Sequence, residues 1–129
     1  MKLPLAYLAA PYSHVDPRVR AARFEAINQC ASVLMRSGLY LFSPISHTHP
    51  IALAGSLPAG FDFWEGYDRV MLSACGLLIV LMLGGWEKSV GVTGEIKIAT
   101  ESKLPIFYTK THDDALEQCV RAIRQHFEQ

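Results

Sequence analysis

The chain has 129 residues, of which 50% are hydrophobic and 19% charged; this composition fits one compact globular domain over residues 1–129 and excludes a disordered chain. The 12 basic and 12 acidic side chains cancel, so no cationic excess is present to hold a polymeric nucleic acid, whereas a small nucleotide needs only local donors. Three cysteines outside any zinc-binding spacing indicate free thiols, and no apolar stretch is long enough to cross a bilayer. We therefore expect a soluble, cytoplasmic protein without a signal peptide.

Apolar runs and helical periodicities alternate along the chain. In chain order they predict a strand at 5–10, a helix at 16–38, a strand at 39–42, a loop at 44–61, a helix at 62–75, a strand at 76–83, a helix at 89–102, a strand at 104–109 and a helix at 113–129. The ends of the first helix are marked by Asp16 as a cap, Pro17 at the first helical position and Gly38. Residues 44–61 hold three prolines and two glycines, so we expect a long loop there with at most one helical turn.

Four successive strand–helix alternations predict the α/β class. We expect a single-domain, three-layer Rossmann-like (flavodoxin-like) fold, in which a parallel sheet carries helices on both faces. In such sheets ligands bind beyond the carboxyl ends of the strands. The loops at 10–16, 43–61 and 84–94 should therefore surround the functional site.

The segment "SVGVTGE", residues 89–95, places a single acid after glycines, a serine and a threonine, directly beyond a strongly apolar run. Ser89 can cap the helix that follows, which leaves the next three N–H groups free to point at an anionic ligand. Gly91 and Gly94 permit a close approach of phosphate or sugar, and Glu95 lies near enough to face the same pocket. The alternative is that Glu95 is an ordinary acid near a helix start. Neither a dinucleotide-binding nor a P-loop pattern is present.

Three stretches, "YLAAPYS" (7–13), the acid Asp68 and "SVGVTGEI" (89–96), resemble the nucleoside 2-deoxyribosyltransferase superfamily. The serine six residues before the glutamate is more similar to the deoxynucleoside 5′-monophosphate N-glycosidases than to the transferases that act on free nucleosides. Over nearly its whole length the chain resembles a small uncharacterised bacterial and phage branch, through "LAAPYSHVDPRVRAARFEAIN", "FSPISHTHPIA" and "LGGWEKSVGV".

The resemblance implies cleavage or transfer of an N-glycosidic bond, with no cofactor. Glu95 would attack C1′ of the sugar and form a glycosyl-enzyme ester, which requires an ionised carboxylate that a helix start helps to maintain. Asp68 would hydrogen-bond Glu95 or help protonate the leaving base, and Tyr7 would orient the glutamate or the sugar. Ser89 and the backbone of Gly91 would hold a 5′-phosphate.

Further residues are expected to complete the substrate site: Pro11, Tyr12, Ser43, His47 and Trp86. Of the two histidines in "SHTHP", His47 is the favoured ligand contact, because a neutral imidazole can bind a base edge or a phosphate. Trp86 is the favoured stacking partner for a base, whereas Phe63 is expected in the core.

The chain departs from the superfamily pattern at two positions. Gly76 replaces an acid that often precedes the central strand, and Lys97 replaces a glycine; we expect this lysine to face solvent. In characterised relatives a second subunit completes the pocket, so we expect a homodimer or a higher homo-oligomer. These departures also leave open a non-catalytic module that binds or senses a nucleotide.

The remaining polar clusters allow further interpretations. His14, His47 and His49 lie on neighbouring loops, so a metal-dependent hydrolase is a third alternative, although we expect no metal. Arg18, Arg20 and Arg23 are expected on a solvated helix face. Arg69 is expected to pair with an acid or to face water.

Overall fold

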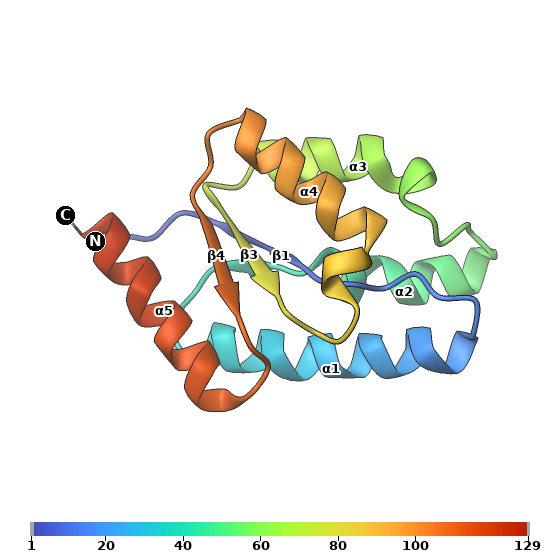
Figure 1. Cartoon of the computed structure of the whole chain (residues 1–129), viewed down its shortest axis with the longest axis horizontal. Helices are drawn as coiled ribbons and strands as arrows, with labels where there is room; N and C mark the ends of the chain where they lie inside the picture. Colours follow the sequence, from blue (N-terminus) through green and yellow to red (C-terminus); the bar gives the residue numbers. More distant parts are fainter. Residues whose placement is uncertain (1, 129) are drawn as a thin grey trace.

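The computed structural model describes residues 2–128, and its strands and helices alternate as expected (Figure 1). In chain order the elements are β1 (Ala6–Ala9), α1 (Pro17–Arg36), β2 (Leu41–Phe42), α2 (Pro44–Gly55), α3 (Phe61–Ser73), β3 (Leu77–Leu81), the 3₁₀ turn η1 (Trp86–Lys88), α4 (Val90–Glu101), β4 (Ile106–Thr109) and α5 (Asp113–Phe127). The predicted α/β class is confirmed, as is the single-domain, three-layer Rossmann-like arrangement.

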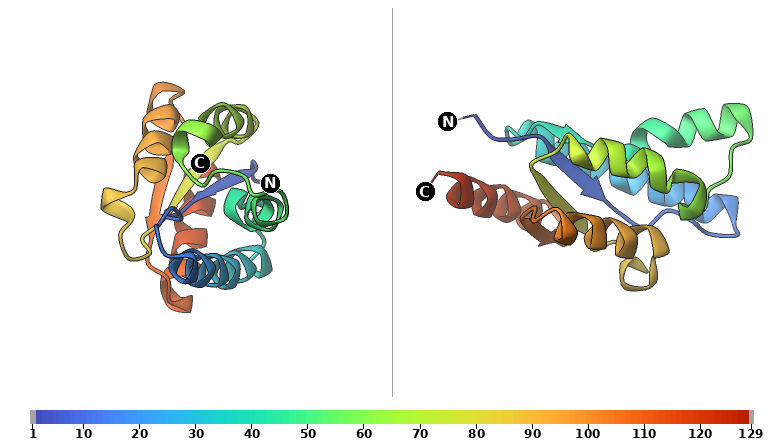
Figure 2. Two further views of the ribbon diagram at one scale, coloured as in Figure 1. Left: turned by 90° about the vertical axis from the view of Figure 1, so that its right-hand side faces the viewer. Right: turned by 90° about the horizontal axis from the view of Figure 1, so that it is seen from above.

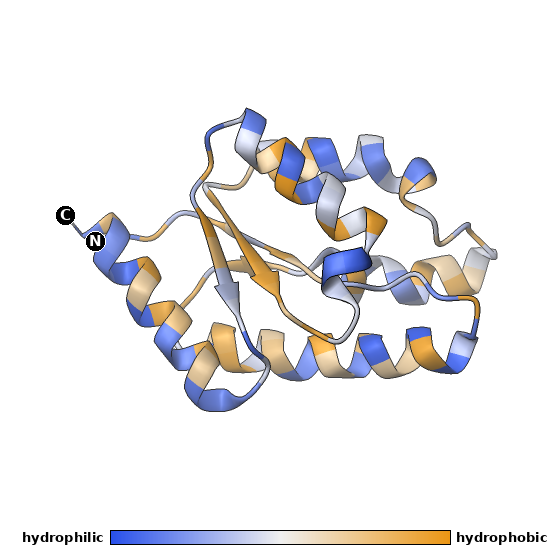
Figure 3. Ribbon diagram, in the orientation of Figure 1, coloured by the Kyte–Doolittle hydropathy of each residue, from blue (hydrophilic) through white to orange (hydrophobic). Residues whose placement is uncertain are grey.

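The sheet is parallel throughout, with the strand order β2-β1-β3-β4. β1 and β3 occupy its centre, and both are buried along their whole length, as continuous apolar strands covered on two faces require. Figure 3 shows β3 as an almost uniformly hydrophobic strand, whereas β4 at the edge is more polar. Because all four strands run the same way, their carboxyl ends meet at one edge.

Helices cover both faces of the sheet, α1 and α5 on one face and α3 and α4 on the other (Figure 2). Successive strand residues point to opposite faces, so Leu8 and Ile79 pack with α1 and α5, while Tyr7 and Val80 pack with α3 and α4. The three cysteines are buried and unpaired, as the sequence predicted. This alternation places Tyr7 on the face that also carries Asp68 and Glu95.

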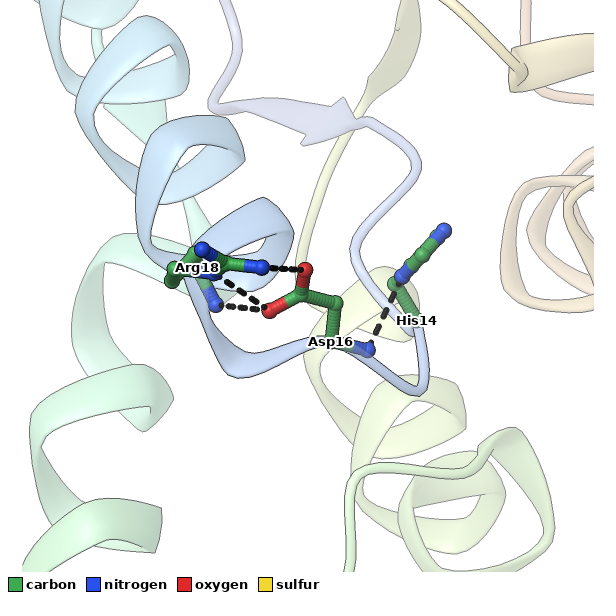
Figure 4. Close-up of polar contacts among 3 residues, drawn as sticks. All are labelled: His14, Asp16 and Arg18. Atoms are coloured by element: carbon green, nitrogen blue, oxygen red, sulfur yellow. Dashed lines mark hydrogen bonds and ion pairs between the residues drawn. The ribbon is translucent and has the colours of Figure 1, made fainter.

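The first helix begins as its sequence predicts. The Asp16 carboxylate caps α1 by accepting the Arg18 N–H and pairs with the Arg18 guanidinium (Figure 4). His14 Nδ1 accepts the N–H of Asp16, so this histidine belongs to the cap. At the other end Gly38 adopts a φ of 101°, which favours glycine.

The predicted loop at 44–61 is wrong over most of its length, because residues 44–55 form the helix α2. Pro44 occupies the first turn, where its missing N–H costs no hydrogen bond, so this proline favours the helix start. Pro50 lies inside the helix on its exposed side, and packing of α2 against α1 and the end of β1 outweighs its unfavourable helix propensity. The helix ends at Ser56, whose φ is 54°.

Candidate active site

A cavity of about 510 Å³ lies at the carboxyl edge of the sheet. Its walls come from the chain after β1, from α2, from the first turns of α3, and from the junction of η1 and α4. These are the loop regions that the fold class selects, together with one face of the helix α2, a segment that had been expected as loop. The polar side chains predicted to be functional can therefore be compared with the residues that line this cavity.

Tyr7 contacts Glu95 beneath this cavity. The Tyr7 hydroxyl, on β1, donates a hydrogen bond to Glu95 Oε2 on α4. Tyr7 has no exposed surface and Glu95 is 5% exposed, yet Glu95 still lines the cavity. The residues are 88 positions apart in the chain, so the parallel sheet creates this contact.

Asp68 lines the same cavity from α3 and is 9% exposed. Its helix packs closely on α4 because Gly94 has no side chain: a Cβ at that position would collide with the ring of Phe61. The glycine before Glu95 therefore permits the approach of the two helices that carry the acids. Gly76, the departure from the superfamily pattern, has a similar role, since a Cβ there would lie 2.5 Å from Pro4 Cβ.

Burial dominates the electrostatics of this cluster. Burial and the charge of Asp68 raise the pKa of Glu95 well above its ordinary value, while the Tyr7 hydrogen bond opposes the rise. Burial also raises the pKa of Asp68 to about 6, again against the effect of Tyr7. Desolvation therefore outweighs the help that the helix start was expected to give to the ionised form of Glu95. Both shifts favour the protonated acids.

The start of α4 has the cap that its sequence predicts, with one correction. Ser89 Oγ accepts the N–H of Val92, so that group is not free for a ligand. The N–H groups of Val90 and Gly91 have no partner within the helix, because the helix begins there. Ser89, Val90 and Gly91 all line the cavity, beside Lys88.

Arg23 was expected on a solvated helix face, but the structure places it at the cavity wall. It is half-buried, and its guanidinium donates to the carbonyl oxygens of Ser13 and Gly84, which brings the charge to the cavity wall near Lys88. Gly84 follows β3 and is 61 positions from Arg23 in the chain. The location of the Arg23 guanidinium therefore depends on the folded sheet and could not be predicted from the local sequence. Arg18 and Arg69 pair with Asp16 and Glu65, respectively.

Several residues predicted to bind substrate lie elsewhere. Ser43 and His47 line a separate shallow hollow between α1, α2 and α3, where Ser43 Oγ hydrogen-bonds Ser46 Oγ. Pro11 is buried behind the cavity wall. Trp86 packs against Tyr108, with 5.8 Å between the ring centroids, and is not among the cavity-lining residues.

Other aromatic and polar side chains occupy the cavity instead. Tyr12, as predicted, lines it, and the Tyr12 hydroxyl hydrogen-bonds Nδ1 of His49, a residue that the sequence did not favour. Trp64 also lines the cavity and donates its Nε1–H to the Pro58 carbonyl. Phe63, expected in the core, is 50% exposed. No local sequence signal distinguishes Trp64 from Phe63, because which of them faces inward depends on how α3 docks.

The candidate metal ligands do not converge. Within residues 2–128, no group of three or more histidine, cysteine, aspartate or glutamate side chains is arranged to hold a metal ion. His14 caps α1, His47 is exposed and His49 faces the cavity. Lys97 is exposed, as expected. None of the helices in the described part of the chain has the length and apolar character needed to span a bilayer.

Fold and site together define a small Rossmann-like α/β domain whose acid-lined cavity lies at the carboxyl edge of its sheet. The chain belongs to the family described as a domain of unknown function (DUF1937), whose model matches residues 5–111. No curated protein matches the chain significantly. The matched segment contains all of the cavity-lining residues, so the candidate site is part of the family domain.

Proposed function

We propose that this protein cleaves the N-glycosidic bond of a nucleoside or nucleoside 5′-monophosphate through a covalent intermediate on Glu95. The observation that carries the proposal is that Glu95, which accepts a hydrogen bond from Tyr7, lines one cavity together with Asp68. Glycosidic cleavage needs a carboxylate nucleophile and a separate proton donor. Two buried acids whose pKa values are both raised can supply both groups, one as the carboxylate and the other as the proton donor.

The reaction requires the form in which Glu95 is ionised and Asp68 holds the proton, so bound substrate has to reverse the order in which burial leaves the two pKa values. A Glu95 oxygen forms a bond to C1′ as the bond from C1′ to the base nitrogen breaks; the bonding electrons pass to the base, which takes the Asp68 proton. Positive charge that develops on the sugar stabilises the Glu95 anion, which burial disfavours. Water then attacks C1′ and transfers a proton to Asp68, which frees Glu95. A second base in place of water gives transfer.

The charge distribution of the cavity supports a phosphorylated substrate. Arg23, Lys88 and the first N–H groups of α4 gather at one end, where an anion is stabilised by both charge and hydrogen bonds. Glu95 lies further along α4, more than one helical turn past these N–H groups. The aromatic side chains of Phe61 and Trp64 add apolar surface on which a base can pack.

The test is release of free base from a panel of ribo- and deoxyribonucleoside 5′-monophosphates, followed by chromatography. We expect release from at least one member, and a loss of at least 1,000-fold in Glu95→Gln, on the order of that seen when a catalytic nucleophile is removed. A 2′-fluoro analogue, which slows hydrolysis of the ester, should add the mass of the sugar phosphate to the wild-type chain only.

Glu101→Gln is the matched control, because Glu101 lies exposed at the far end of the same helix. It should retain full activity. Base release that persists in Glu95→Gln would contradict the assignment of the nucleophile. Tight nucleotide binding without release by the wild type would instead favour a binding or sensing module.

A further inference from the structure

Tyr12 and His49 form a hydrogen-bonded pair in the cavity wall. His49, on α2, is 7% exposed, and its ring stacks on Phe24 with 4.2 Å between centroids. The Tyr12 hydroxyl hydrogen-bonds Nδ1 of this ring and lies edge-on to it. The imidazole is therefore held in position by a neighbour on each side.

The charge beside Tyr12 favours one direction for this hydrogen bond. The positive charge of Arg20 lowers the pKa of the Tyr12 phenol against the larger effect of burial, which makes the phenol a better donor. We therefore assign the donor role to the Tyr12 hydroxyl and the acceptor role to His49 Nδ1. Burial, then the charge of Arg20, lower the pKa of His49 against an opposing effect of Glu25, so the ring stays neutral. A neutral ring that accepts at Nδ1 carries its proton on Nε2.

The Nε2–H group has no hydrogen-bond partner among the described residues, in which Nδ1 is the only His49 ring atom to hydrogen-bond. No side-chain nitrogen or oxygen in this part of the chain is both fully buried and without a partner. Nε2 is therefore accessible, and because His49 lines the cavity, the group faces it. A buried polar side chain is thus held ready to donate to a ligand.

The topology places this donor away from the anion-binding end. α2 follows β2 and α4 follows β3, with β1 between these strands in the sheet. The helix α2, which carries His49, therefore lies on one side of the β1 end, and the start of α4, which follows Lys88, lies on the other; Figure 2 shows these two helices on opposite sides of the strand. A nucleotide whose phosphate contacts α4 and whose sugar lies at Glu95 directs its base toward α2.

We propose that His49, oriented by Tyr12, is a specificity-determining residue that donates its Nε2–H to a carbonyl oxygen of the base and selects against an amino group at that position. This inference rests on the proposed function for the placement of the nucleotide. It names the substrate class of the site: nucleotides with a keto base, such as hypoxanthine or uracil, over their amino counterparts adenine and cytosine. An amino group directed at an Nε2–H brings two donors together, which leaves both without a partner.

The test measures binding by calorimetry with the Glu95→Gln protein, so that no turnover is needed. The probes are two matched pairs of 5′-monophosphates, inosine with adenosine and uridine with cytidine. We expect the keto member to bind about tenfold more tightly in at least one pair, the difference that one buried hydrogen bond makes. Adding His49→Gln should reduce this preference to near unity, because an amide can turn to donate or accept. Adding His49→Leu should remove it with weaker binding of both members.

Nitrogen-15 spectra of the five histidines provide a readout that a merely structural role would not change. The His49 signals, identified by their absence in His49→Gln, should show the proton on Nε2, and Tyr12→Phe should remove this preference. His126→Gln, exposed on α5, is the control and should keep the binding preference. A proton on Nδ1, equal binding within both pairs, or a preference unchanged in His49→Leu overturns the inference. A keto preference in binding with no base release by the wild type leaves it intact and contradicts only the proposed function.

Discussion

Among residues 2–128, the Tyr7 hydroxyl is the one group that hydrogen-bonds the side chain of the proposed nucleophile, and its effect can be isolated by Tyr7→Phe. The hydrogen bond lowers the pKa of Glu95 against the effect of burial, so its removal raises that pKa further. Because the nucleophile must be ionised, the acidic limb of the pH profile of kcat/KM should move to higher pH. We expect kcat/KM at pH 6 to fall by about 10- to 100-fold, with a smaller loss at pH 9.

The control for this variant is Tyr40→Phe, which removes a hydroxyl from an exposed tyrosine remote from the cavity. Its pH profile should overlay that of the wild type. A uniform loss in Tyr7→Phe, equal at pH 6 and pH 9, would mean that the hydroxyl contacts the substrate rather than tuning Glu95. Base release by the wild type is followed across the pH range by chromatography.

Individual site residues were predictable only where the chain carried a pattern around them. Tyr7, Asp68 and Glu95 lie in stretches that resemble a known superfamily, and all three meet in the structure. The sequence favoured His47 as the ligand contact, but His49 is the one that lines the cavity, because the segment expected as loop is a helix. On a helix, residues two positions apart point about 200° from one another, so only one of them faces the cavity.

At the scale of elements, the packing of α3 on α4 depends on the absence of a side chain at Gly94. In an open helix position Gly→Ala stabilises by up to about 1 kcal/mol, but here the added methyl collides with the Phe61 ring. We expect Gly94→Ala to destabilise the protein by about 1 to 3 kcal/mol, the usual range for overpacking. Urea denaturation measures this change.

Gly66→Ala on α3 is the matched control, since a Cβ at Gly66 would meet no atom within 4 Å. That variant should be as stable as the wild type or more so. Adding Phe61→Leu to Gly94→Ala should recover part of the loss, because the shorter side chain makes room for the methyl. Equal stability of Gly94→Ala and the wild type would show that the two helices can separate without cost.

Element types followed from the sequence more readily than helix–helix contacts did. The strands are apolar runs, and the caps of α1 and α4 are marked by Asp16 and Ser89, so these elements were predictable. The helix α2 was not, because its prolines and glycine argue for a loop and its stability comes from packing on α1. Local pattern cannot report a contact made by residues distant in the chain.

At the scale of the whole molecule, the fold maintains two acids in surroundings that oppose their ionisation. The rest of the core is apolar or hydrogen-bonded, and no buried polar side-chain atom of the described residues lacks a partner. The acids at the cavity therefore make the native state less stable than the same fold with neutral groups there. Such a cost at a functional site is a common compromise between stability and activity.

This compromise predicts how stability depends on pH. The pKa of both acids is higher in the folded than in the unfolded state, so between these values the folded state binds more protons, and stability falls as pH rises. For Asp68 the rise from 3.8 to about 6 corresponds to about 3 kcal/mol, lost between about pH 4 and pH 6; the loss from Glu95 extends to higher pH. Asp68→Asn and Glu95→Gln should each be more stable than the wild type at pH 8, with the advantage shrinking toward pH 4. Urea denaturation at several pH values measures this difference, and a pH-independent difference would show that both acids ionise freely in the folded protein.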